Sequence, residues 1–266
     1  MLGDRDREGL VPKDMKPLGV ICALPEELEH LDAALDIDAT TERAGYQFRQ
    51  GHLDGCPVVL VEGGIGKVGG ALVATLLLER FDCRGLLLSG VAGGLDPDLG
   101  IGDVVIAERL IQHDYGAMVE GRLKPYRPGV PPLGEWRDRL GYEMNAGLRA
   151  AVAGALDGFT LPSLSAAATG GAPRVPRLRF GTVLTGDQFI NCEATRRRLF
   201  ESFAAQAVEM EGGAVAQVAE RYGAPCVIFR SLSDLAGADS HLDFAAFLAA
   251  TAEGAARVLR RVIPAL

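Results

Sequence analysis

From residue 18 onwards, short apolar runs alternate with amphipathic stretches. The apolar runs end at glycine, proline or charged residues, which is typical of buried strands. We expect strands over 18–24, 46–55, 57–64, 84–90, 102–116 (one strand or a pair), 177–186, the start of 207–223, and 224–234. The amphipathic stretches predict helices over 25–35, 64–81, 140–156, 193–203, the later part of 207–223, and 244–263. The helix at 64–81 is apolar nearly all round and is therefore expected to be buried.

Alternating strands and helices predict a single α/β domain with three layers, in which helices cover both faces of a mixed, mostly parallel central sheet. We expect this domain to span residues 18–266. Residues 1–17 are charged throughout and lack the apolar centre of a secretory signal, so we expect a mobile N-terminal extension. Two segments rich in proline and glycine interrupt the pattern, and they predict a long loop at 117–137 and a surface insertion at 160–176.

Composition narrows the classes of protein that fit this pattern. Acidic residues outnumber basic ones by 35 to 27, for a net charge of −8, which disfavours binding to a nucleic-acid backbone. No apolar run reaches the ~18 residues of a membrane helix. The 5 cysteines are widely spaced, as expected of reduced thiols in the cytoplasm. With 4 scattered histidines there is no local metal-ligand pattern, so no metal site is expected.

In α/β folds, ligands bind at the carboxyl ends of the strands. After the strand predicted at 18–24, Glu26 and Glu27 stand where a helix begins. The simplest interpretation is that they are solvated and complement the positive end of the helix dipole. Two glycine-rich turns, SGVAGG at 89–94 and GGIGKVGG at 63–70, offer backbone N–H groups that a ligand can approach closely. Neither matches a dinucleotide or P-loop motif, so the glycines alone indicate phosphate binding only weakly.

Two acidic motifs follow later strands. In VEMEGGAVA, Glu209 and Glu211 flank Met210 where an apolar strand becomes an apolar helix. Carboxylates near a core are costly unless they are paired or hydrogen-bonded, which fits either a helix cap or a binding site. In SLSD, Asp234 follows Ser233 and the apolar run VIFR. A partly desolvated carboxyl at such an exit suits general acid catalysis, and a helix cap is again the alternative.

Taken in order, these motifs resemble those of one family. The blocks LGVICALPEELEHL, GGIGKVGGALVATLLLERF, LLLSGVAGGL, GDVVIAE, GTVLTGDQFI, AVEMEGGAVAQVAERYGAP and FRSLSDLAGADSH are similar to the 5′-methylthioadenosine/S-adenosylhomocysteine nucleosidases, members of the nucleoside phosphorylase/hydrolase superfamily. The resemblance is weak only at 117–137 and 160–176. It implies a nucleoside phosphorylase-like fold, no cofactor, and hydrolysis of the N-glycosidic bond of methylthioadenosine or adenosylhomocysteine to adenine and a 5′-substituted ribose.

The resemblance also implies catalytic roles. Glu27 falls where the family has the base that activates the attacking water, and Asp234 falls on the acid that protonates adenine N7. Glu211 falls on the residue that grips the ribose hydroxyls, with Met210 packed on the sugar and Glu209 assisting in the same site. Cleavage makes the ribose cation-like and the purine a poor leaving group, so surrounding carboxylates and a positioned acid suit this reaction.

The remaining implied contacts involve the adenine. Phe189 falls on the residue that stacks on the base, and the backbone of Ile190 on the group that hydrogen-bonds its edge. Ala92 and Gly93, in the turn after the strand 84–90, would approach the base through their main chain, and Ser233 completes the set of substrate-binding residues. The expected partner is thus a small nucleoside.

Three alternatives remain open. Phosphorolytic relatives hold phosphate with arginines, whereas this chain has Leu88 near the strand exit and an acid, Glu27, that would repel phosphate, so hydrolysis is favoured. Val91 stands where many of these nucleosidases have serine, which leaves a futalosine- or hopanoid-type nucleoside as an alternative substrate. A non-catalytic nucleoside-binding or storage protein is the third, and the presence of Glu27, Glu211 and Asp234 together argues against it.

The resemblance implies that a neighbouring subunit closes the pocket, so the active unit is expected to be a homodimer. The loop 117–137 carries Tyr126, Val130, Leu133 and Trp136 between prolines. Aromatic and aliphatic residues on a stiffened loop are candidates for a partner surface. The alternative is that Trp136 folds back on its own domain.

Overall fold

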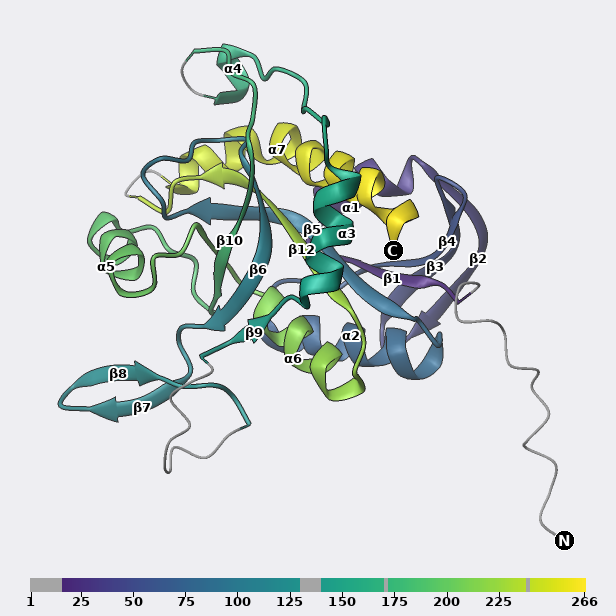
Figure 1. Ribbon diagram of the computed structural model, residues 1–266, viewed down its shortest axis with the longest axis horizontal. Coiled ribbons are helices and arrows are strands. Elements are labelled where there is room, and N and C mark those ends of the chain that lie inside the picture. The colour runs from purple at the N-terminus through teal and green to yellow at the C-terminus, as the bar shows by residue number, and fades with distance from the viewer. Residues whose placement is uncertain (1–15, 130–139, 170–171, 238–239) are drawn as a thin grey trace, which may run out of the picture.

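A computed structural model describes residues 16–129, 140–169, 172–237 and 240–266. Helices lie on both sides of a broad twisted sheet, and a separate hairpin projects from one end (Figure 1). The helices are α1 (Pro25–Asp32), α2 (Lys67–Arg80), α3 (Ala146–Ala155), α4 (Ala166–Thr169), α5 (Glu193–Phe203), α6 (Gly212–Tyr222), α7 (Ser240–Val262) and the 3₁₀ turn η3 (Ile263–Ala265). None of these described helices is long and apolar enough to span a membrane.

The strands form one large mixed sheet and one hairpin. They are β1 (Leu18–Cys22), β2 (Leu35–Arg43), β3 (Tyr46–Leu53), β4 (Cys56–Glu62), β5 (Gly85–Gly94), β6 (Val104–Gln112), β7 (Gly116–Val119), β8 (Arg122–Pro125), β9 (Tyr142–Glu143), β10 (Leu178–Thr185), β11 (Ala207–Glu209) and β12 (Cys226–Asp234). Among the described residues the order of the large sheet is β11-β10-β6-β12-β5-β1-β4-β3-β2, with β9 paired to β6, while β7 and β8 pair with each other.

The sheet topology brings several strand ends to one place. β1 runs parallel to both β4 and β5, and β12 runs parallel to β5, so the carboxyl ends of β1, β5 and β12 meet at one edge. The short strand β11 pairs antiparallel with the end of β5, with Ala207 opposite Gly94. Antiparallel pairing of β12 with β6 makes the sheet mixed. The predicted mixed α/β fold is therefore confirmed.

Two hydrophobic clusters hold the helices on the two faces. One packs α1, α3 and α7 on the sheet and includes Leu31, Val152 and Leu259, all inaccessible to solvent. The other packs α2 and α6 on the opposite face and includes Leu77 and Val215. Burial of these side chains is the main favourable contribution to the folded state.

Some predicted elements were wrong in extent. The helix predicted over 25–35 ends at Asp32, and a strand that was not predicted, β2, follows it. β2 lies at the edge of the sheet, where Leu35 is its only buried residue, so it lacks the alternating apolar pattern of a half-buried strand. The helix predicted over 140–156 begins at Ala146, because Asn145 caps it by accepting a hydrogen bond from the N–H of Gly147.

The sequence predicted that the helix at 64–81 is buried nearly all round, and this prediction was wrong for α2. Val68 is 80% exposed and Leu72 41% exposed on the side that faces away from the sheet. The loop predicted over 117–137 also contains structure, since the hairpin β7–β8 occupies most of its first half. Tyr126 packs edge-on against Tyr115, with ring centroids 5.1 Å apart.

Several predictions fall partly or wholly outside the described residues. Residues 1–15 of the predicted N-terminal extension lie outside the described residues. Val130, Leu133 and Trp136 of the predicted partner surface also lie outside them. The predicted insertion at 160–176 is described except for 170–171. Arg174 anchors it to the body, because its guanidinium donates to the buried carboxylate of Asp103 at 2.7 Å.

Candidate active site

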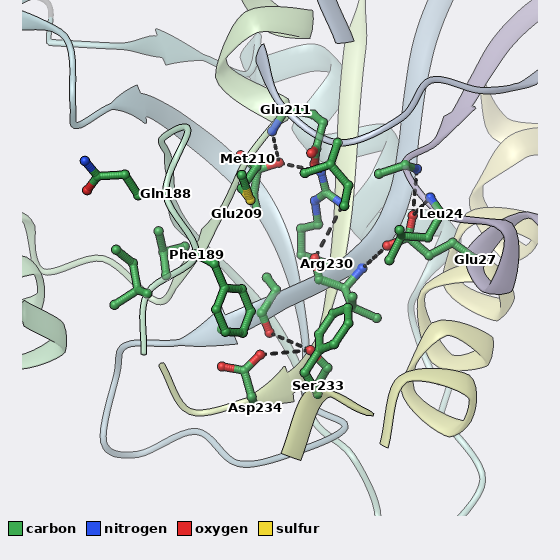
Figure 2. Close-up of a pocket in the computed structure, with 18 residues that line it drawn as sticks. Leu24, Glu27, Gln188, Phe189, Glu209, Met210, Glu211, Arg230, Ser233 and Asp234 are labelled. Carbon is green, nitrogen blue, oxygen red and sulfur yellow. Dashed lines mark hydrogen bonds and ion pairs between the residues drawn. The ribbon is translucent and has the colours of Figure 1, made fainter. Parts of the chain in front are cut away.

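Every site residue predicted from the sequence lines one pocket at the strand ends (Figure 2). Its predicted residues are Glu27, Ala92, Gly93, Phe189, Ile190, Glu209, Met210, Glu211, Ser233 and Asp234. The other lining residues are Ala23, Leu24, Ile65, Val91, Gln188, Val208, Arg230 and Phe244.

Glu27 is a buried carboxylate rather than a solvated helix-end acid. Its Oε2 accepts hydrogen bonds from the N–H groups of Ala23 at 2.7 Å and Leu24 at 3.0 Å, and its Oε1 accepts one from Val91 at 2.9 Å. Burial raises the pKa of Glu27, while the charge of Arg230 and the three N–H donors oppose that rise. Glu26, by contrast, is exposed and fits the simpler helix-dipole interpretation.

Arg230 is a charged lining residue of the pocket that the sequence analysis missed. It lies in β12 with 1% of its surface exposed, and its Nη2 contacts the carboxylates of both Glu209 and Glu211, the latter at 2.8 Å. A charged residue inside the apolar run CVIFRSLSD was a signal, because a buried arginine requires paired carboxylates. The site therefore holds one buried cation among three acidic side chains, those of Glu27, Glu209 and Glu211.

Glu209 and Glu211 have different surroundings. Glu209 accepts from the Thr185 hydroxyl and from the N–H groups of Glu211 and Gly212, the latter at 2.7 Å, so both of its oxygens are engaged within the protein. Glu211 accepts from the N–H of Gly66 through Oε1 and from Arg230 Nη2 through Oε2, each at 2.8 Å, and its side chain also lines the pocket. Burial and the nearby negative charge of Glu209 raise the pKa of Glu211 to about 7, although Arg230 counteracts them.

Asp234 lies away from Glu27 in the pocket, beyond Ser233 (Figure 2). It is 2% exposed, and its Oδ1 accepts from the N–H of Ala236 at 2.8 Å. The Ser233 hydroxyl donates to its Oδ2 at 3.0 Å. Ala92 and Gly93 lie in β5 rather than in the turn that the sequence predicted, and a Cβ at Gly93 would come 3.0 Å from Oδ1, so glycine allows the close approach of this strand.

The rest of the pocket is largely apolar. Phe189 is half exposed and meets Phe244 edge-on, with ring centroids 5.8 Å apart. Leu24 and Ile65 extend the apolar wall. The arrangement offers a flat apolar surface for a planar base and acidic groups for a sugar. Among the described residues there is no group of His, Cys, Asp or Glu that would hold a metal ion.

The comparisons with known proteins agree with this geometry. The sequence profile of the phosphorylase superfamily matches residues 17–264. A 5′-methylthioadenosine/S-adenosylhomocysteine nucleosidase of Mycobacterium tuberculosis is 51% identical over 250 residues, which cover 94% of this chain and 97% of that protein. The fold and pocket thus define a member of the phosphorylase superfamily.

Solved structures give the same result. The structure of a 5′-methylthioadenosine/S-adenosylhomocysteine nucleosidase of Colwellia psychrerythraea with adenine has a TM-score of 0.78 at 31% identity and covers 95% of this chain and 96% of that one. The futalosine hydrolase of Helicobacter pylori has a TM-score of 0.79 at 28% identity and covers 95% of this chain and 99% of its own. Within the superfamily, the chain belongs to the family of 5′-methylthioadenosine/S-adenosylhomocysteine nucleosidases.

Proposed function

We propose that this protein hydrolyses the N-glycosidic bond of 5′-methylthioadenosine and S-adenosylhomocysteine, releasing adenine and the 5′-substituted ribose. One observation carries the proposal. A single pocket holds a buried carboxylate with a raised pKa, Glu27, together with a second buried carboxyl, Asp234, beside an apolar aromatic wall. A base and an acid at separate positions around a nucleoside are what hydrolysis of its glycosidic bond requires.

The residues support a simple sequence of steps. Glu27 accepts a proton from a water molecule, whose oxygen bonds to C1′ of the ribose. The C1′–N9 bond breaks, its electron pair stays with the purine, and Asp234 delivers a proton to N7. Glu211 binds the ribose hydroxyls, and its negative charge, together with that of Glu27, favours the cation-like sugar of the transition state. Phe189 stacks on the base, and the Ile190, Ala92 and Gly93 backbones hold its edge.

Water is a better nucleophile than phosphate for this pocket. Arg230 is the only cationic side chain among the described lining residues, and Glu209 and Glu211 already bind its Nη2. A phosphate placed there would face Glu27 and Glu211 with no free arginine to bind it. We therefore expect the reaction to be independent of phosphate.

The test is a substrate panel assayed for free base with and without phosphate. We expect adenine release from methylthioadenosine and adenosylhomocysteine at a rate that phosphate does not change. Formation of a ribose 1-phosphate would contradict hydrolysis. Similarity to the futalosine hydrolase of Helicobacter pylori makes futalosine a second candidate substrate, and a higher kcat/KM for it than for methylthioadenosine would favour that function. Tight nucleoside binding without turnover would indicate a binding protein.

The proposal includes a homodimer in the cytoplasm. Exposed apolar side chains gather at the start of α2 and around the β7–β8 hairpin, namely Ile65, Val68, Leu72, Tyr115, Met118, Val119 and Leu123. Ile65 also lines the pocket, so a partner covering this surface would close the pocket at that side. All 5 cysteines are free thiols, as expected in a reducing compartment.

A further inference from the structure

The loop between β10 and α5, residues 186–192, carries both Phe189 and Ile190 and has no helix or strand of its own. Backbone hydrogen bonds fasten its two ends, from the N–H of Gly186 to the carbonyl of Glu209 and from the N–H of Cys192 to the carbonyl of Ala236. Between these ends, the position of the Phe189 ring depends on the other contacts that the loop makes.

An ion network on the α2 side of the pocket supplies that hold. Asp114, just after β6, accepts from Lys67 Nζ through Oδ1 at 2.7 Å and from the N–H of Asp187 through Oδ2 at 2.8 Å. Asp187 in turn accepts from the N–H of Lys67 through Oδ1 at 2.9 Å, and its Oδ2 lies 3.5 Å from Lys67 Nζ. Segments that are far apart in the sequence are thus joined at one point.

Three features indicate that this network has a purpose beyond surface charge pairing. The side chains of Lys67 and Asp114 are each only 17% exposed. Although burial opposes it, the hydrogen bonds from Lys67 and from the Asp187 N–H hold the pKa of Asp114 below its ordinary value. Lys67 is also the first residue of α2, where a cation is unfavourable next to the helix dipole. The helix has no capping side chain of its own, and Asp187 provides one from the loop.

The network also reaches the ribose side of the pocket. Gly66 precedes Lys67, and its N–H donates to Glu211 Oε1. Its φ of +102° is a conformation that favours glycine. Asp187 of the base loop thus accepts from the N–H of Lys67, and Glu211 accepts from the N–H of the preceding residue, Gly66.

We propose that Lys67, Asp114 and Asp187 are positioning residues that hold the base-binding loop 186–192 against the turn preceding α2, and so set the affinity of the site for the purine. This inference rests on the proposed function only in taking Phe189 and Ile190 as the base contacts. Because stacking contributes equally in the bound substrate and in the transition state, loss of the network raises KM and leaves kcat nearly unchanged.

The test compares Asp114→Asn and Asp114→Ala with wild type, using methylthioadenosine turnover and inhibition by adenine. An asparagine offers one acceptor, so it loses either Lys67 Nζ or the Asp187 N–H, and alanine loses both. We expect KM and the adenine inhibition constant to rise together, about tenfold or more for alanine, with kcat within about threefold. A purely structural role would instead lower the thermal midpoint and the active fraction without changing KM.

Two further variants keep the test decisive if Asp114→Ala does not fold. Lys67→Met removes the charge that Asp114 binds and is expected to raise KM, whereas Lys67→Arg keeps the charge and is expected to restore most of the affinity. The matched control is Asp54→Asn, which weakens the ion pair of Asp54 with Arg260 at 2.6 Å, outside the pocket, and should leave KM unchanged.

The outcomes separate this inference from the proposed function. Adenine release by the wild-type enzyme tests the proposed function. The ratio of KM, or of adenine affinity, between each variant and wild type tests the network. Adenine affinity measured by titration calorimetry provides that ratio even if turnover fails. KM and adenine affinity within about twofold of wild type in the folded Asp114 and Lys67→Met variants would overturn the inference.

Discussion

At the scale of single residues, the pocket uses one type of side chain for several purposes. Glu209 is saturated by donors of the protein itself and holds Arg230 and the start of α6. Glu211, two residues later, keeps a face toward the pocket, and Glu27 is held by three backbone N–H groups. These differences follow from the local donors, because the charge and size of the three side chains are the same.

The proposed roles of Asp234 and Glu27 predict a large loss of activity on conservative substitution. Asp234→Asn keeps the shape and can still hydrogen-bond, but it cannot deliver a proton, so kcat should fall by about 10²–10⁴-fold. Glu27→Gln should cause a comparable loss, because the water is no longer deprotonated. Adenine release gives the rates, and the thermal midpoint of each variant reports folding. Wild-type kcat in folded Asp234→Asn would exclude the assigned role.

The raised pKa of Glu211 predicts how stability depends on pH. Between its ordinary value of 4.5 and about 7, the folded protein holds a proton that the unfolded chain has released. Folding then takes up a proton, so the free energy of unfolding falls as pH rises through this window. Glu211→Gln should make the fall shallower, although not flat, because the pKa of Glu27 is raised too.

Urea unfolding at several pH values in that window measures this effect. The exposed Glu26→Gln is the matched control and should follow the wild-type curve. If the free energy of unfolding of Glu211→Gln decreased with pH as steeply as that of wild type, the prediction would be contradicted.

At the scale of elements, the site is made by strands that end side by side. β5 lies between β12 and β1 in the sheet, and a Cβ added at its Gly90 would collide with Arg230 Nη1 and Glu27 Oε1. β11 reaches the same point because it pairs with the end of β5. Glu209, the last residue of β11, contacts Arg230 of β12 because both strands pair with β5.

This crowding predicts that Gly90→Ala lowers activity strongly. The new Cβ must displace Arg230 or Glu27, and shifts of that size in a reacting group cost about tenfold to a hundredfold in rate. The matched control is Gly154→Ala in α3, where an added Cβ meets nothing within 4 Å. That change should leave the rate unaltered and stabilise the helix by about 0.5–1 kcal/mol. Unchanged kcat/KM in Gly90→Ala would show that Arg230 and Glu27 can be displaced without loss of activity.

At the scale of the whole molecule, the exposed apolar surface at the start of α2 and the β7–β8 hairpin predicts self-association. Val68→Asp places a carboxylate in the proposed contact and should weaken the dimer, because a charge there loses its hydration on association. Sedimentation equilibrium measures the change in dissociation constant. KM for substrates with bulky 5′ groups should rise more than KM for adenosine, since Ile65 lies at the edge of both surfaces.

Val175→Asp is the control for this prediction. Val175 is 55% exposed but lies in the 160–176 segment, away from α2 and the hairpin, so its substitution should not change association. A fully active wild-type monomer at assay concentration would contradict the dimer.

Sequence alone determined most of the fold and the membership of the pocket. Helix α5 was predicted with its observed ends, Glu193–Phe203, because a charged amphipathic stretch is bounded by clear changes of composition. Glu209 and Asp234 stood out as acids at the ends of apolar runs, whereas the role of Glu27 came only from the family resemblance. Strand ends converge in any α/β sheet, so their residues were expected to meet there.

The pairing of those residues, by contrast, depends on the three-dimensional arrangement of the strands. Nothing local in the sequence connects Arg230 with Glu209 and Glu211, or Lys67 with Asp114 and Asp187, because each contact joins elements that are distant along the chain. Edge strand β2 and hairpin β7–β8 escaped prediction because neither buries an apolar face. Periodicity reports burial, whereas ion pairing depends on which strands are neighbours, and the folded sheet alone determines that.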